Sequence, residues 1–71
     1  METVQDMELQ FNHNRTEVII KTTCKELIYF FEKFKIPKKN NGWILKNIDE
    51  NNINYIKTKL YDDVKNIYGQ N

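Results

Sequence analysis

Apolar and polar residues alternate strictly near the start of the chain. Met7, Leu9 and Phe11 are separated by single polar residues, and a period of two is typical of a half-buried β-strand. Residues 16–22, which are rich in β-branched side chains, predict a second strand. The two segments are close enough along the chain to pair as neighbours in one sheet.

A tight turn at His13 and Asn14 would join these two strands, because Asn tolerates the positive φ that two-residue turns require. This register gives every apolar residue of the first strand a partner on the same face. The predicted pairs are Phe11 with Thr16, Leu9 with Val18, and Met7 with Ile20.

Apolar residues then recur at helical spacing and predict a helix over residues 23–35. Thr23 and Glu26 have the spacing of a capping box at its start. The helix is expected to end before Pro37, since proline disfavours the helical conformation of the residue that precedes it. The apolar stripe of this helix would consist of Cys24, Leu27, Ile28, Phe30, Phe31 and Phe34.

Residues 38–42 predict a loop, and the Trp-Ile-Leu run in residues 43–48 fits either a third strand or a helical turn. We favour the strand, because a glycine precedes the run and its side chains suit a buried position beside the hairpin. A second helix is predicted over residues 50–68, with Asp49 as N-cap and Gly69 as a left-handed C-terminal residue. Its apolar stripe would consist of Ile53, Ile56, Leu60, Val64 and Ile67.

The resulting order of elements is β-β-α-β-α. Two amphipathic helices can cover one face of a small sheet, so we expect a small two-layer α+β domain over residues 7–71. Residues 1–6 show no period and are expected to form a disordered tail. A chain of 71 residues is too short for a second domain and can build one modest core.

Composition favours a cytoplasmic protein from an AT-rich genome. Cys24 is the single cysteine, which excludes an intramolecular disulfide, and no apolar run approaches the roughly 18 residues that span a bilayer. We therefore expect no association with a membrane. The chain has no Ala and no Ser but is rich in Asn, Lys and Ile, whose codons are AT-rich. That bias is typical of a low-GC bacterium, of a phage, plasmid or other mobile element of such a host, or of an AT-rich eukaryotic parasite.

The residues that usually carry out catalysis are scarce. Without Ser, the commonest nucleophile is absent, and Cys24 lies on an apolar stripe, where a small buried hydrophobe is expected. His13 is the single histidine, and one imidazole with scattered carboxylates is too little for a metal site. Two glycines, Gly42 and Gly69, cannot form a Gly-rich phosphate loop. We expect a protein that is not an enzyme and has no metal or cofactor.

Two tyrosines fall outside the predicted apolar stripes. Tyr29 lies on the polar side of the first helix near Lys33, and Tyr55 lies opposite the stripe of the second helix. Exposed aromatic residues often anchor protein interfaces. The sequence therefore favours a protein-binding module that regulates or inhibits a partner protein. Replacing both tyrosines with alanine should weaken partner binding without unfolding the domain.

Nucleic-acid binding is the alternative function. The net charge is only +1, but residues 33–46 contain five lysines and no acid. Lysines neutralise phosphates and an exposed aromatic ring stacks on bases, so the candidate contacts are Lys38, Lys39, Trp43 and Lys46. A third interpretation is a homodimer, in which a second copy covers the wide apolar stripe of the first helix.

Overall fold

An antiparallel sheet of five strands and two helical segments make up residues 1–69, the part of the chain that this computed structural model describes. The expected α+β class is confirmed. Residues 70 and 71, the end of the predicted domain, lie outside the described residues. The elements are β1 Glu2–Val4, β2 Met7–Phe11, β3 Glu17–Thr22, α1 Lys25–Lys33, β4 Lys38–Lys39, β5 Gly42–Lys46, α2 Glu50–Tyr55, η1 Ile56–Leu60 and α3 Tyr61–Tyr68.

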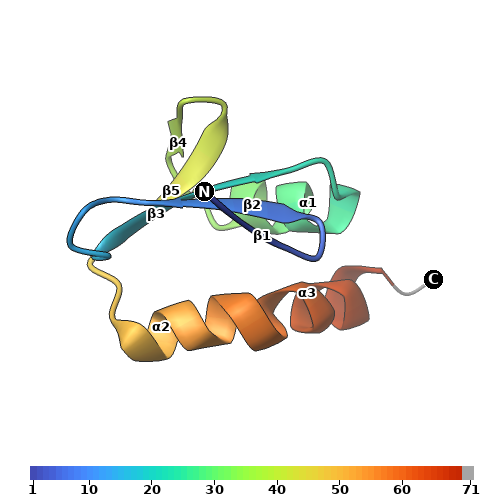
Figure 1. Ribbon diagram of the computed structural model, residues 1–71. Coiled ribbons are helices and arrows are strands. Elements are labelled where there is room, and N and C mark those ends of the chain that lie inside the picture. Colours follow the sequence, from blue (N-terminus) through green and yellow to red (C-terminus); the bar gives the residue numbers. More distant parts are fainter. Residues whose placement is uncertain (70–71) are drawn as a thin grey trace.

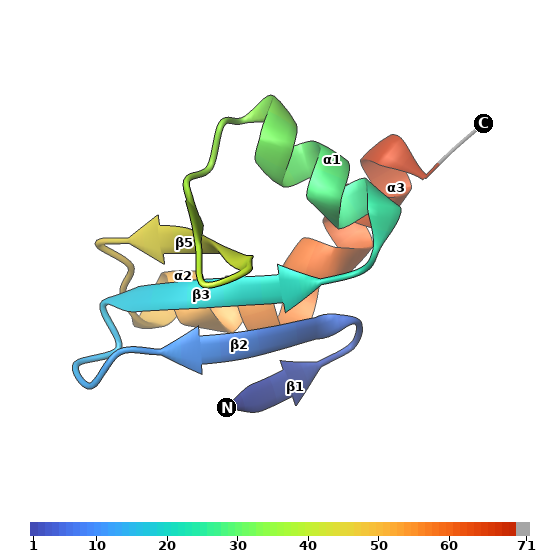
Figure 2. The same ribbon diagram turned by 90° about the horizontal axis from the view of Figure 1, so that it is seen from above.

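The strands lie in the order β1-β2-β3-β5-β4, and each neighbouring pair is antiparallel. Figure 1 shows the sheet above the long C-terminal helical segment, with the β4–β5 hairpin rising on the opposite side. Figure 2 shows α1 next to β3 and β5, and α1 also contacts α3. One core therefore lies between the sheet, α1 and the C-terminal segment. Its fully enclosed side chains include Met7, Leu9, Val18, Ile20, Leu27 and Phe31.

Strand β1 occupies the segment for which the sequence predicts a disordered tail. Val4 pairs with Met7 and Glu2 with Leu9, and Val4 packs against the core. The two strands are joined through Gln5, whose φ is 52°. A positive φ at the first central residue is a feature of type II′ hairpin turns. The structure differs from the prediction because a strand of three residues is too short to display a period.

Strands β2 and β3 form the expected hairpin in a register shifted by two residues. Leu9 faces Ile20 instead of Val18, and Phe11 faces Val18. A shift of two residues leaves each side chain on its original face of the sheet. The predicted pairs are therefore wrong, whereas the predicted inward face is correct, with Leu9, Val18 and Ile20 all buried.

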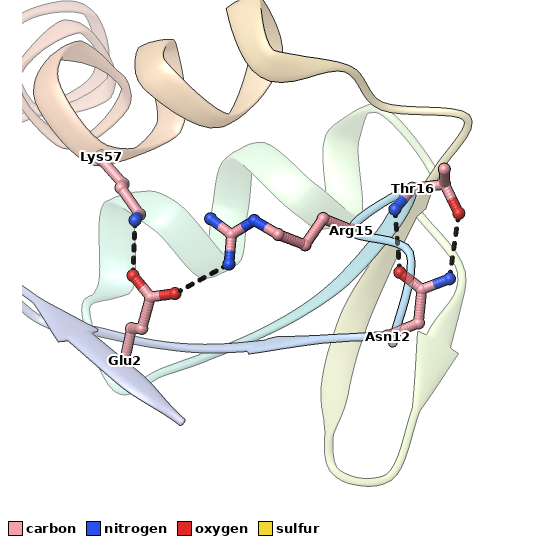
Figure 3. Close-up of polar contacts among 5 residues, drawn as sticks. All are labelled: Glu2, Asn12, Arg15, Thr16 and Lys57. Atoms are coloured by element: carbon pink, nitrogen blue, oxygen red, sulfur yellow. Dashed lines mark hydrogen bonds and ion pairs between the residues drawn. The ribbon is translucent and has the colours of Figure 1, made fainter.

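A longer turn than expected causes this shift. The side-chain oxygen of Asn12 accepts hydrogen bonds from the backbone N–H groups of Thr16 and Glu17, and Figure 3 shows Asn12 also bonded to the Thr16 hydroxyl. Arg15, with a φ of 57°, takes the left-handed conformation that the sequence assigned to residues 13–14. The side chain of Asn12 thus stabilises a longer loop than the predicted turn of two residues.

Helix α1 begins later than predicted and without the expected capping box. Cys24 is the N-cap, and no side chain caps the helix there. The backbone N–H of Cys24 donates to the Thr22 hydroxyl, and its thiol donates to the Glu26 carboxylate. Thr23 and Glu26 therefore do not form the predicted reciprocal pair, because Glu26 is engaged by the cysteine instead.

Residues 38–42, predicted as a loop, form most of a second hairpin. Lys39 pairs with Gly42, and the two residues between them, Asn40 and Asn41, have φ values of 52° and 65°. Two consecutive positive φ values define a type I′ turn, which matches the twist of a hairpin. The favoured third strand is confirmed as β5, which also pairs with β3. β4 escapes prediction because its two lysines are exposed and show no apolar period.

The predicted second helix is confirmed as a continuous helical segment formed by α2, η1 and α3. Asp49 is its N-cap, and Asp49 and Asn52 accept hydrogen bonds from each other's backbone N–H groups. The prediction for Gly69 is wrong, since its φ is −90°, outside the left-handed region. Its N–H donates to the Lys65 carbonyl, which ends the segment with an ordinary helical hydrogen bond.

The π-helical turn η1 corrects the phase of this segment. Ile56, Leu60, Val64 and Tyr68 are spaced by four residues, and an α-helix drifts by about 40° over each such step. A wider turn absorbs part of this drift, so that the first three are buried and Tyr68 packs against the core. Ile67, predicted on the apolar stripe, is instead 67% exposed.

Polar contacts fasten the N-terminal hairpin to the C-terminal segment. The Glu2 carboxylate accepts hydrogen bonds from Lys57 on η1 and from Arg15, as Figure 3 shows. These bonds, first that from Lys57 and then that from Arg15, hold the pKa of Glu2 below its ordinary value. The Tyr61 hydroxyl donates to the Asp6 carboxylate at 2.9 Å, which raises the pKa of Tyr61.

Candidate protein-binding surface

Four aromatic side chains form a connected surface along α1 and α3. The ring of Tyr29 lies 5.2 Å from that of Tyr68, Phe30 lies 6.3 Å from Tyr68, and Phe34 lies 5.0 Å from Phe30. We call these four residues the aromatic surface. The ammonium group of Lys33 lies 5.9 Å from the Tyr29 ring and 5.5 Å from the Tyr68 ring, where a cation is attracted by the ring faces.

Phe34 is the most unusual member of this surface, because 56% of it is exposed. The sequence predicts Phe34 on the buried stripe of the first helix. Helix α1 ends one residue earlier, at Lys33, and Phe31 fills the core position that the stripe offers. Fully burying a Phe side chain is worth about 1.5–3 kcal/mol, so an occupant that covered Phe34 would gain much of that energy.

A cleft of about 380 Å³ adjoins the aromatic surface at Phe30. The end of α1 shapes one wall: Lys35 takes a left-handed φ of 55°, and the Ile36 N–H donates to the Phe31 carbonyl. This is a Schellman motif, which turns the chain sharply after a helix. It directs Ile36 toward β5, where Leu45 lines the opposite wall. The floor is formed by Phe31, Ile56 and Leu60.

Tyr55 lines the same cleft from α2, although the sequence places it opposite the apolar stripe. The residue is 39% exposed, and its hydroxyl donates to the Asp63 carboxylate at 2.6 Å. This hydrogen bond is the main cause that raises the pKa of Tyr55. The structure therefore places Tyr29 and Lys33 together on the aromatic surface and Tyr55 at the neighbouring cleft.

Comparison with protein-family models, with curated proteins and with solved structures found no match.

The candidate nucleic-acid contacts do not form one surface. Trp43 is only 6% exposed and stacks on Phe31 with the two rings 5.3 Å apart, so it cannot stack on a base without opening the core. The ammonium group of Lys38 lies over this ring, 5.2 Å from the Trp43 centroid. Lys38 and Lys39 lie on the hairpin, whereas Lys46 lies at the other end of β5.

Neither of the two residues considered for catalysis lies in the cleft. His13 is exposed in the turn between β2 and β3, and Cys24 is partly buried with its thiol bonded to Glu26. Within residues 1–69, no three His, Cys, Asp or Glu side chains converge as metal ligands would. None of the helices in this part of the chain is long and apolar enough to cross a membrane.

Sequence reasoning proposed Tyr29, Lys33 and Tyr55 as interface residues and assigned Phe30 and Phe34 to the buried stripe. Phe30 does pack against the core, whereas Phe34 is exposed. The signal for these two was the width of the stripe on the first helix. Six apolar residues on so short an element exceed what one sheet and one neighbouring helix can cover. In the sequence, this excess of apolar residues supports the homodimer interpretation. In the structure, the apolar side chain of the stripe that is left uncovered is the ring of Phe34.

Proposed function

We propose that the chain is a non-catalytic protein-binding module that regulates or inhibits a partner protein by occupying its surface. The observation that supports this function best is the exposed ring of Phe34 next to an apolar cleft. Aromatic residues are enriched in protein interfaces, and a few of them carry most of the binding energy. Tyr29, Tyr55 and Phe34 have the residue types and the exposure that such anchors need.

A regulator or inhibitor of this kind needs no catalytic group, because its effect comes from the partner surface that it covers. The single, partly buried cysteine suits the reducing cytoplasm, where we expect the protein to act. The shortage of Ala and Ser fits an origin in a phage or mobile element of a low-GC host. Such an element would direct its product at a protein of the host.

Photo-crosslinking tests this function directly. With benzoylphenylalanine at position 34, we expect a discrete adduct with another protein in cells that naturally encode the chain. The matched control carries the same group in place of Gln10, an exposed residue of β2 whose neighbours Leu9 and Phe11 point to the helical side of the sheet. Position 10 is expected to give no such adduct. Identical adducts from both positions, or none from position 34, would contradict the proposal.

Replacing Tyr29 and Tyr55 with alanine should weaken this adduct while circular dichroism stays unchanged. Loss of an interface anchor costs about 2 kcal/mol or more, which is roughly a thirtyfold loss of affinity. An adduct with the mass of two chains would instead identify a homodimer and would exclude a different protein as the partner at this surface.

A further inference from the structure

We infer that the cleft binds an extended segment of the partner, which adds to the outer edge of β5 as a short strand. This inference rests on the proposed function and specifies how the partner is bound. Strand addition at an open sheet edge obtains affinity from main-chain hydrogen bonds and specificity from pockets for alternate side chains. The cleft beside β5 offers both of these features.

The outer edge of β5 is covered only along its first half. β4 consists of Lys38 and Lys39, which pair with Trp43 and Gly42. One residue further along, the N–H of Ile44 donates to the Pro37 carbonyl at 2.8 Å. Continuing this antiparallel ladder would require a return bond from residue 37 to the Ile44 carbonyl. Proline has no N–H, so the ladder stops there.

The backbone groups beyond this point are directed at the cleft. Hydrogen-bonding direction alternates along a strand, so Lys46 directs its N–H and C=O to the same side as Ile44, away from β3. The side chain of Lys46 lies on the same face of the sheet as that of Ile44, whereas Leu45, which lines the cleft, lies on the opposite face. Because Lys46 also lines the cleft, we infer that its backbone reaches it. Within residues 1–69, no backbone bond outside the helices and strands involves the Lys46 N–H.

The Ile44 carbonyl and the Lys46 N–H have the spacing that one residue of an added parallel strand needs. That residue would donate its own N–H to the Ile44 carbonyl and accept a hydrogen bond from Lys46. The side chain of that residue would lie on the same face of the sheet as Leu45, so an apolar side chain there would enter the cleft lined by Ile36, Leu45 and Phe31.

Charge and size specify the segment further. Among the described residues that line the cleft, Lys46 alone is charged, and Lys35 directly precedes Ile36, which lines the opposite wall. A volume of about 380 Å³ is at the small end of binding pockets, which hold about 300–1,000 Å³. The structure therefore favours a short apolar segment that is flanked by acidic residues.

A second copy of the chain fits this cleft poorly. A two-fold interface brings the same patch of both copies together, and one whose axis passes beside Phe34 would place each basic border next to its own counterpart. Lys33 and Lys35 on either side of Phe34 would then approach the same lysines of the other copy. A partner with acidic residues beside its apolar ones avoids this repulsion.

The test uses the intact chain labelled with ¹⁵N and the pentapeptide acetyl-Glu-Val-Phe-Val-Glu-amide. We expect binding with a Kd of about 1 mM or below, with the largest amide shifts at Ile44, Lys46 and Ile36 and slower hydrogen exchange at Lys46. The matched peptide, N-methylated at Phe, lacks the donor for the Ile44 carbonyl and should bind about tenfold more weakly. The analogue with Lys in place of Glu should also be weaker.

Two variants of the chain separate the backbone from the charge. Lys46→Ala removes the charge and keeps the N–H, so a loss of about threefold is expected. Lys46→Pro removes both, and the loss should be at least tenfold. Should the proline variant fail to fold, the N-methylated peptide still tests the backbone contact.

Equal affinity of the parent and N-methylated peptides would overturn the inference, as would shifts confined to the hairpin Lys38–Asn41. Tighter binding of oligo(dT) at the same amides would overturn it too and would favour nucleic acid. Any of these results would leave the cross-linked adduct at position 34 unchanged. The inference can therefore fail while the proposed function stands, and loss of the adduct would refute the function separately.

Discussion

Replacing Phe31 with alanine is expected to lower the free energy of unfolding by about 3–5 kcal/mol, as is typical for a fully buried Phe. Phe31 has no exposed surface, and its ring stacks on Trp43 at the centre of the core. A chain of this size has a total stability of only about 4–10 kcal/mol, so this single change should remove a large part of it. Urea titration followed by Trp43 fluorescence measures the loss.

Phe34→Ala is the matched control, because it removes the same side chain from the same helix end. More than half of Phe34 is exposed, so we expect its replacement to change stability by about 0.5 kcal/mol or less. A similar loss for both variants would show that Phe34 belongs to the core. That result would remove the main support for the proposed binding surface.

Gly42→Ala is expected to destabilise the chain by about 2–3 kcal/mol, because the site has no room for a methyl group. A Cβ at position 42 would lie 2.7 Å from the Cγ2 atom of Ile19 and 2.8 Å from the carbonyl oxygen of Ile20. The second of these atoms is backbone of β3, which is held between β2 and β5 and cannot move away cheaply. Urea titration again gives the free energy of unfolding.

A double-mutant cycle identifies the cause of this effect. Ile19→Ala removes the closer of the two atoms, so it should recover part of the cost of Gly42→Ala and make the two changes non-additive. The recovery should be incomplete, because the Ile20 carbonyl stays in place. Full additivity, or a Gly42→Ala variant as stable as the parent chain, would contradict the close packing of β5 against β3.

The faces of the elements could be predicted from the sequence, but their register and ends could not. The period of two at Met7–Phe11 fixes which side chains point inward. The same side chains point inward after any shift of the pairing by two residues, so the register between the two strands is decided by the turn. At the turn, the side chain of Asn12 stabilises the longer loop through its hydrogen bonds to the backbone. The conformational preferences of His13 and Asn14, on which the prediction was based, do not reveal these bonds.

A helical wheel of constant pitch caused two of the errors about the surface. It continued the first helix to residue 35 with Phe34 on the buried stripe, whereas α1 ends at Lys33 and the Phe34 ring lies outside the core. It also missed the π turn at Ile56–Leu60, which moves Ile67 to the surface and brings Tyr68 onto the core. Both errors concern positions where tertiary packing overrides the local period.

The burial of Trp43 and the open edge of β5 depend on contacts between distant residues. The Trp-Ile-Leu run favours a strand, but only the packing of α1 against it buries the Trp43 ring under Phe31. The proline that stops the second hairpin is visible in the sequence. Its effect on Ile44 becomes visible only once β4 is known to pair with β5.

The central claim is that a different protein, and not a second copy of this chain, covers Phe34 and the cleft. Sedimentation velocity of the purified chain at about 1 mM tests it most directly, because even contacts of millimolar affinity would populate a dimer there. We predict a monomer at every concentration, with no change on replacing Phe34 with Asp. A concentration-dependent dimer that Phe34→Asp abolishes would contradict the claim and would assign the surface to self-association.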